Sequence, residues 1–190
     1  MDNIIIQDIF HSLQNKKDIY KDYLGIFSIE DFNDLNILEF NQFSLILFID
    51  NINAGLGHWV TIFKSANKLF FMDSYGKSPD FYRKNIKNKF KHFDYNLKMR
   101  LQLDFTTVCG AYAIYFIDLI SQCKYQMNCF MKTFRNTFIL KPGIKDKFII
   151  KYLFKIYPIL RDKKKINCVN LFCSKDFIIN FRKCEKVLCG

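Results

Sequence analysis

The sequence contains no CxxC pair, few histidines and no long apolar segment. Its seven cysteines are an odd number and its three histidines are scattered, which disfavours both a disulfide framework and a zinc site. No apolar run reaches the roughly 18 residues that a membrane-spanning helix needs, so we expect no membrane partner. Residues 1–6 lack the basic segment of a secretory signal, which predicts a reducing compartment. Ordinary free thiols are therefore expected at Cys123, Cys129, Cys168, Cys173, Cys184 and Cys189.

Hydrophobic residues are abundant and indicate a folded chain. Half of the 190 residues are hydrophobic and 22 are Phe, whereas a disordered chain has low hydrophobicity and few aromatic residues. A chain of this length has enough apolar surface for one core. No repeat, low-complexity tract or linker divides it, so residues 1–190 are predicted to form one domain, which we expect to be monomeric. The tail, 166–190, mixes apolar and basic residues, and no element is assigned to it.

The net charge of +11 is unevenly distributed along the chain. Residues 1–50 hold three Lys and nine acidic residues, a net charge of −6. Residues 77–100 have a net charge of +6, and residues 141–165 have a net charge of +7. Such asymmetry is typical of proteins with a polyanionic partner, most often nucleic acid. A solvated basic surface that only maintains solubility explains the charge equally well.

Periodicity and turn residues predict most of the secondary structure. The continuous apolar run at 43–49 is typical of a buried strand, and 58–63 with 68–73 form a predicted hairpin. A turn around Gly25 is expected at 23–28, and residues 30–36 are predicted to be a loop or a short helix. The other predicted elements are helices at 2–14, 78–92, 110–120, 126–134 and 144–157, and a strand at 94–101.

The helix that begins near Cys109 is almost wholly apolar, so we expect it to be buried. Cys109 then lies at the N-terminus of a core helix, where backbone N–H groups and the helix dipole favour a thiolate over a thiol. Gly110 has no side chain to obstruct an approaching carbonyl carbon. The position suits a nucleophile, although buried cysteines are often inert.

The predicted hairpin supplies a base for this cysteine. His58 begins its first strand and Asp73 ends its second, and the two ends of a hairpin with matched strands lie side by side. A nucleophilic cysteine needs a base and a group that orients the base. We therefore expect His58 to accept the thiol proton and Asp73 to orient its ring. Gln102 and the backbone N–H of Cys109 are expected to stabilise the oxyanion.

These residues occur in motifs that resemble adenain, the adenovirus maturation protease, and more loosely the proteases of SUMO and other ubiquitin-like proteins. The motifs are Gly57-His58-Trp59, Met72-Asp73-Ser74-Tyr75-Gly76, and Gln102 separated by six residues from Cys109-Gly110. The resemblance extends over 23–121, and small proteases of this type occur in virophages and Polinton-like elements. It departs at Asp73, where adenain has glutamate and the SUMO-type enzymes have aspartate.

The resemblance implies an α+β, papain-like fold in which a central mixed sheet packs against the helix that begins at Cys109. It implies a thiol endopeptidase that cleaves viral capsid precursor proteins after glycine during maturation, in the virion and the host-cell cytoplasm. Gly57, Trp59 and Gly110 are expected to contact the substrate, because a narrow cleft excludes larger side chains. Adenain is stimulated by DNA and by a viral peptide. No cysteine here clearly matches the one that links the peptide, so only stimulation by DNA is kept as an expectation.

Two alternatives remain open from the sequence. One is a deconjugase that removes a ubiquitin-like modifier after its terminal glycines. The other is a basic, nucleic-acid-binding capsid component without activity. Lys147, Lys151 and Lys155, each four residues apart, line one edge of a predicted helix and are the candidate nucleic-acid contacts.

Overall fold

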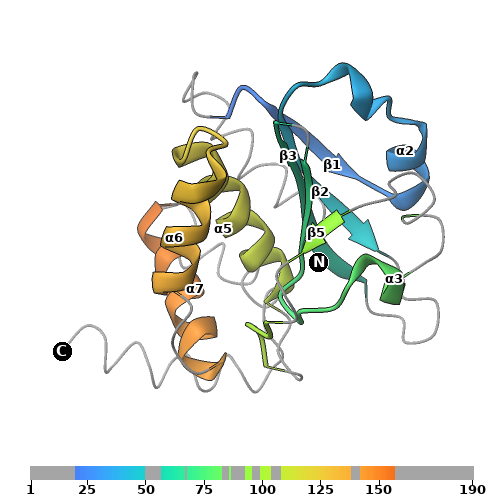
Figure 1. Ribbon diagram of the computed structural model, residues 1–190. Helices are drawn as coiled ribbons and strands as arrows, with labels where there is room; N and C mark the ends of the chain where they lie inside the picture. The colour runs from blue at the N-terminus through green and yellow to red at the C-terminus, as the bar shows by residue number, and fades with distance from the viewer. Residues whose placement is uncertain are drawn as a thin grey trace.

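A computed structural model describes residues 20–49, 57–66, 68–82, 86, 93–95, 99–103, 108–137 and 142–156. These residues form a mixed β-sheet with α5, α6 and α7 on one side and α2 and α3 on the other (Figure 1). The α+β class that the sequence predicted is confirmed. The predicted helix at 2–14 and the tail at 166–190 lie outside the described residues.

The sheet has five strands within the described part of the chain, in the order β1-β2-β3-β4-β5. Their bounds are β1 Tyr23–Phe27, β2 Phe43–Ile49, β3 His58–Ser65, β4 Lys68–Met72 and β5 Phe93–Tyr95. The two outer pairs, β1–β2 and β4–β5, are parallel, and the central pairs are antiparallel. The predicted strand at 43–49 and the predicted hairpin are therefore confirmed.

The turn predicted around Gly25 is wrong, because residues 23–27 form strand β1. Gly25 has φ +126°, a conformation that side-chain-bearing residues rarely adopt. The pairing of β1 with β2 is irregular between Tyr23 and Ile26. A glycine inside a strand often marks such a bulge, so its conformational freedom bends the strand and does not reverse it.

Six helical segments are described: α2 Ile29–Asp34, the 3₁₀ turn η1 Ile37–Glu39, α3 Pro79–Tyr82, α5 Cys109–Gln122, α6 Met127–Thr137 and α7 Pro142–Ile156. Of the alternatives for 30–36 the short helix is correct, and Ser28 caps it by accepting from the N–H of Asp31 at 3.0 Å. Of the helix expected at 78–92, residues 79–82 and residue 86 are helical, and residues 83–85 and 87–92 lie outside the described residues. The strand predicted for 94–101 is shorter, since 99–101 are not in a strand.

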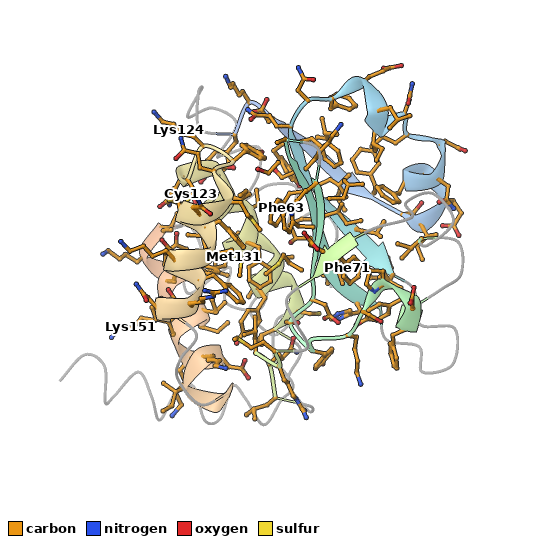
Figure 2. The ribbon with its side chains drawn as sticks, in the orientation of Figure 1. Phe63, Phe71, Cys123, Lys124, Met131 and Lys151 are labelled. Atoms are coloured by element: carbon orange, nitrogen blue, oxygen red, sulfur yellow. A yellow bond between two sulfur atoms is a disulfide. The ribbon has the colours of Figure 1, made fainter. Side chains whose placement is uncertain are left out.

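Both faces of the sheet are covered, which explains why β2 is apolar except for Ser44. Ile46 and Phe63 belong to a core cluster beneath α5, α6 and α7, whereas Leu45 and Phe71 belong to a second cluster on the other face. Figure 2 shows Phe63 and Phe71 on opposite sides of the sheet. A strand buried on both faces has no polar face, so its sequence does not alternate.

Helix α5 is the most buried element that the structure describes, with every residue from Cys109 to Ser121 buried. Its carboxylate, Asp118, is 2% exposed and accepts hydrogen bonds from the hydroxyls of Tyr20 and Tyr152. In return, Tyr112 of α5 donates to Asp146 of α7 at 2.8 Å. Helices α5 and α7 therefore each contribute one buried carboxylate and one tyrosine to the contact. These two reciprocal tyrosine–aspartate hydrogen bonds fix the distance between the helices.

Cys123 and Cys129 are joined by a disulfide, so the expectation of free thiols is wrong at these two positions. Cys123 follows α5 and Cys129 lies in the first turn of α6, with their Cα atoms 5.6 Å apart, a separation that suits the bond. The chain reverses between them through Lys124 and Tyr125, both at positive φ. Cys109 is a free, buried thiol. The other four cysteines lie outside the described residues.

Candidate active site

Cys109 is the first residue of α5 and is 8% exposed. Val108, which precedes it, provides no side-chain cap, so the backbone N–H groups of the first turn are available to other acceptors. The sulfur of Cys109 is hydrogen-bonded by the N–H groups of Gly110 and of Trp59 on β3. The helix terminus and the sheet therefore both supply donors to the thiolate.

His58 begins β3 and lies between Cys109 and Asp73. Its Nε2 is 2.7 Å from Oδ1 of Asp73, and its side chain also hydrogen-bonds Cys109. Because Nε2 is occupied by the carboxylate, Nδ1 is the ring nitrogen that faces the thiol. The contact that the hairpin predicted is confirmed, and the residues predicted to be the nucleophile, the base and the orienting carboxylate are brought together.

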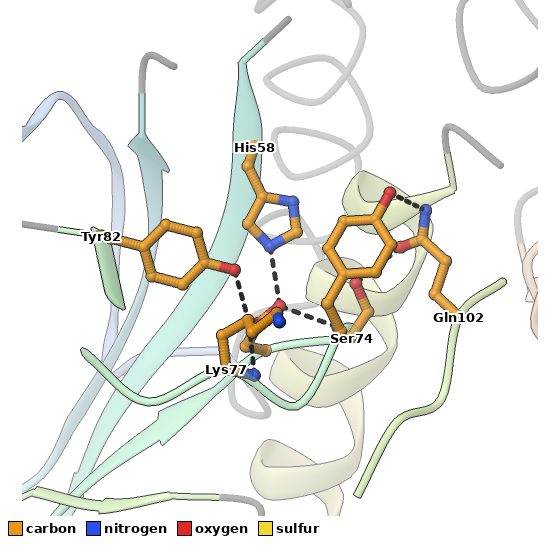
Figure 3. A network of polar contacts seen from close by, with 7 residues as sticks. His58, Ser74, Lys77, Tyr82 and Gln102 are labelled. Carbon is orange, nitrogen blue, oxygen red and sulfur yellow. Dashed lines mark hydrogen bonds and ion pairs between the residues drawn. The ribbon is translucent and has the colours of Figure 1, made fainter. Parts of the chain in front are cut away.

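The carboxylate of Asp73 is fully buried and accepts from four donors (Figure 3). His58 and the N–H of Tyr75, at 2.9 Å, contact Oδ1. The N–H of Lys77, at 2.9 Å, and the hydroxyl of Tyr82, at 2.5 Å, contact Oδ2. Asp73 thus organises its own following turn as well as the histidine. The short aspartate side chain is suited to bonding with backbone groups two to four residues ahead.

Two tyrosine rings pack against the imidazole of His58. The ring of Tyr75 is stacked with a centroid distance of 5.0 Å, and the ring of Tyr82 is stacked at 5.4 Å. Tyr82 therefore contacts the base with its ring and the carboxylate with its hydroxyl. These contacts restrict rotation of the imidazole and shield its bond with Asp73 from water.

Gln102 is fully buried beside this group. Its Nε2 donates to the hydroxyl of Tyr75 at 3.1 Å, and its Oε1 accepts from the hydroxyl of Ser74 at 2.6 Å. Figure 3 shows Gln102 and His58 in the same polar network. The predicted oxyanion residue is therefore close to the base, and its amide is held at both ends.

The charges of the site favour an ion pair. Burial by itself lowers the pKa of His58, but hydrogen bonds and charge interactions with Asp73 and Cys109 outweigh it and raise the pKa to about 9. Burial raises the pKa of the Cys109 thiol, yet its bonds with His58 and with two backbone N–H groups reverse this, so the pKa is lowered. The two directions agree, and both describe a thiolate next to an imidazolium.

The neighbouring groups are consistent with that charge distribution. Burial raises the pKa of Asp73, but the bonds from His58 and Tyr82 lower it below its usual value, so the carboxylate is ionised. Burial, and the negative charge at Cys109, raise the pKa of Tyr75 to about 12. Burial also raises the pKa of Tyr82, with Asp73 adding to the shift. Both tyrosines are therefore neutral donors or acceptors near pH 7.

The three residues predicted to contact the substrate have different surroundings. Gly57 is half-buried, and a Cβ atom added there would lie 1.9 Å from the ring of Phe48. The side chain of Trp59 is 2% exposed and packs against Phe48, with 4.6 Å between the ring centroids. Trp59 contacts Cys109 through its backbone N–H. Gly110 supplies an N–H to the sulfur of Cys109. Packing against Phe48 is thus a second reason for glycine at position 57, and the substrate contacts stay predictions.

The candidate nucleic-acid contacts, Lys147, Lys151 and Lys155, are exposed along α7, and Figure 2 shows Lys151 on the outer side of the helices. Nucleic-acid binding itself stays a prediction. Within the ranges that the structure describes, no group of three His, Cys, Asp or Glu residues is arranged to hold a metal ion. In the same ranges, no helix combines the length and the apolar character needed to cross a bilayer.

Sequence reasoning did not identify Ser74, Tyr75 and Tyr82 as parts of the site. Ser74 and Tyr75 belong to the Met72–Gly76 motif, in which only Asp73 is assigned a role from the sequence. Their position next to Asp73 is the signal that could have identified them. No sequence signal marks Tyr82, because its contact with Asp73 depends on where α3 lies relative to β3 and β4.

No protein-family model matches the sequence, and no curated protein matches it either.

Proposed function

We propose that this chain is a papain-like cysteine endopeptidase of the adenain type, which cleaves capsid precursor proteins after glycine during maturation of a virophage or Polinton-like element. The observation that carries the proposal is the contiguous group formed by Cys109, His58 and Asp73, with Gln102 beside it. Its geometry and charges are those that acyl transfer by a thiolate requires.

The expected reaction follows from the positions of these groups. The Cys109 thiolate attacks the scissile carbonyl carbon, and the carbonyl π electrons move to its oxygen. Gln102 and the N–H of Cys109 donate to that oxyanion, and each donor contributes on the order of 3 kcal/mol to lowering the barrier. As the oxyanion collapses, the bond between the carbonyl carbon and the amide nitrogen breaks, the imidazolium of His58 gives its proton to the leaving amine, and a thioester with Cys109 remains. Water, deprotonated by His58, hydrolyses the thioester and regenerates the thiolate.

The direct test uses a candidate capsid precursor protein from the same virus or element. Its mass spectrum before and after incubation should show new termini after glycine. Cys109→Ala and His58→Ala should each abolish the cleavage, because one removes the nucleophile and the other its base. Both variants should keep the far-ultraviolet circular dichroism of the wild type. Full activity in either variant would refute the assignment.

A second function, removal of a ubiquitin-like modifier, is favoured by one feature, the aspartate at position 73. The SUMO-type proteases that the motifs resemble have aspartate there, whereas adenain has glutamate. Modifier–fluorophore conjugates and the capsid precursor should be assayed side by side with the same enzyme. Turnover of the conjugates without cleavage of the precursor would replace the maturation function by the deconjugating one.

A further inference from the structure

Ser74 contacts Gln102 through both its backbone and its side chain. The carbonyl oxygen of Ser74 accepts from the N–H groups of Leu101 and Gln102 at 2.8 and 2.9 Å. Its hydroxyl donates to Oε1 of Gln102 at 2.6 Å. Ser74 is 1% exposed, so these bonds are made where water does not compete. Three hydrogen bonds therefore join the segment that carries Gln102 to the turn that follows β4.

The side-chain bond matters because a carboxamide has two ends of opposite polarity. Only the NH₂ end of Gln102 can stabilise an oxyanion, while its oxygen would repel one. With the Ser74 hydroxyl on Oε1, the Nε2 hydrogens point away from Ser74 and toward the hydroxyl of Tyr75. The ring of Tyr75 stacks on His58. The NH₂ end of the Gln102 amide is thus directed toward the side on which His58 lies.

We propose that Ser74 is a positioning residue, which fixes the side-chain amide of Gln102 with its donor end toward the reacting carbonyl oxygen. This inference rests on the proposed function for its consequence in catalysis. Ser74 follows Asp73 directly, so consecutive residues orient the base and the oxyanion donor. Ser74 is not a catalytic residue in this scheme, because it acts through Gln102 and does not contact the substrate.

The test compares two reactions of Cys109 that differ in one respect. Alkylation by iodoacetamide forms no oxyanion, whereas acylation by a glycyl p-nitrophenyl ester does. Ser74→Ala should leave the alkylation rate within about twofold and should lower kcat for the ester on the order of 10- to 100-fold, less than the loss of a whole oxyanion donor. KM should change little. A general loss of structure would reduce both reactions together.

A double-mutant comparison isolates the route through Gln102. In a Gln102→Ala background, Ser74→Ala should have no further effect on acylation, because the amide that it positions is absent. An equal loss in both backgrounds, or no loss in the wild-type background, would overturn the proposal. Ser44→Ala is a matched control. Ser44 is fully buried with a 2.7 Å bond to Tyr125, and it pairs with Phe63, at the opposite end of β3 from His58. This control should acylate at the wild-type rate.

A spectroscopic measurement separates failure of this inference from failure of the proposed function. The side-chain amide signals of Gln102 in a ¹⁵N spectrum are assigned by their absence in Gln102→Ala. In Ser74→Ala they should shift and exchange faster with solvent. Unchanged signals would overturn the positioning role even if the enzyme is active. If the wild type is alkylated but never acylated, the proposed function fails, and the spectra still decide the role of Ser74.

Discussion

Replacing Asp73 by asparagine removes the negative charge that favours the protonated form of His58. Burial favours the neutral imidazole, yet the pKa of His58 is raised from 6.5 to about 9, which corresponds to roughly 3 kcal/mol at 1.36 kcal/mol per pKa unit. The hydrogen bond of Asp73 is the largest favourable contribution, and Cys109 supplies most of the rest. If Asp73 provides about half of the net rise from 6.5 to about 9, its loss lowers the pKa of His58 by about one unit.

The pH dependence of kcat/KM for ester hydrolysis measures this change. The proposed mechanism requires the imidazolium, so the alkaline limb of the wild-type profile should lie near pH 9. In Asp73→Asn it should move to about pH 8. Because the pKa of His58 is raised on folding, its pairing stabilises the fold fully below pH 6.5 and this contribution is lost as the pH rises through about 9. Asp73→Asn should therefore destabilise the protein more at pH 6 than at pH 10.

A matched substitution controls for the removal of a buried carboxylate. Asp118 is 2% exposed, is hydrogen-bonded by tyrosines, and lies nine residues along α5 from Cys109, or about 13 Å at 1.5 Å per residue. Asp118→Asn should lower stability without moving the alkaline limb. The reasoning fails if Asp73→Asn leaves the limb near pH 9, or if both variants move it equally.

Two further substitutions test the surroundings of the site. Tyr82→Phe keeps the ring on His58 but removes the hydroxyl from Asp73, which should cost about 1.5 kcal/mol of unfolding free energy, the low end for a bond to a charged group. Folding lowers the pKa of Asp73, so the difference in unfolding free energy between wild type and Tyr82→Phe should have its full size above pH 3.8 and should shrink at lower pH. Urea unfolding at several pH values measures this difference, and a difference independent of pH would contradict the prediction. Cys129→Ser should lower the free energy of unfolding by about 2 kcal/mol, the value expected for closing a loop of about seven residues, while leaving ester hydrolysis unchanged. The wild type in a reducing agent should match this variant, and a wild type insensitive to reductant would argue against the bond.

The candidate site could be predicted in large part because Cys109, His58 and Asp73 each lie at an end of a strongly patterned element. The apolar run of α5 placed Cys109 at a helix N-terminus, and the hairpin brought His58 to Asp73. Pairing of Thr61 with Met72 places Asp73 across from Val60, two residues short of His58, and the side chains span that offset. Such features depend on local periodicity, which a single sequence records.

The remaining features depend on tertiary contacts that periodicity does not encode. Gly25 reads as a turn residue in isolation, but pairing with β2 keeps its segment in the sheet. The spacing of Cys123 and Cys129 has no diagnostic pattern, and only the reversal at Lys124 and Tyr125 brings them together. The apolar neighbours of Asp118 predicted a buried helix but indicated no partners for its carboxylate. Its two tyrosine partners, Tyr20 and Tyr152, come from segments distant in sequence, so the buried carboxylate could be rationalised only from the fold.

The two reciprocal tyrosine–aspartate hydrogen bonds between α5 and α7 limit how this sequence can change during evolution. Changing Tyr152 or Tyr112 to a non-donor removes a hydrogen bond from a buried carboxylate, and changing Asp118 or Asp146 removes a carboxylate acceptor from a tyrosine hydroxyl. Each pair is therefore expected to change only together, through an intermediate of lower stability. Among relatives of this chain, the two tyrosine–aspartate pairs should be either both retained or replaced as whole pairs, while the exposed face of α7 varies independently.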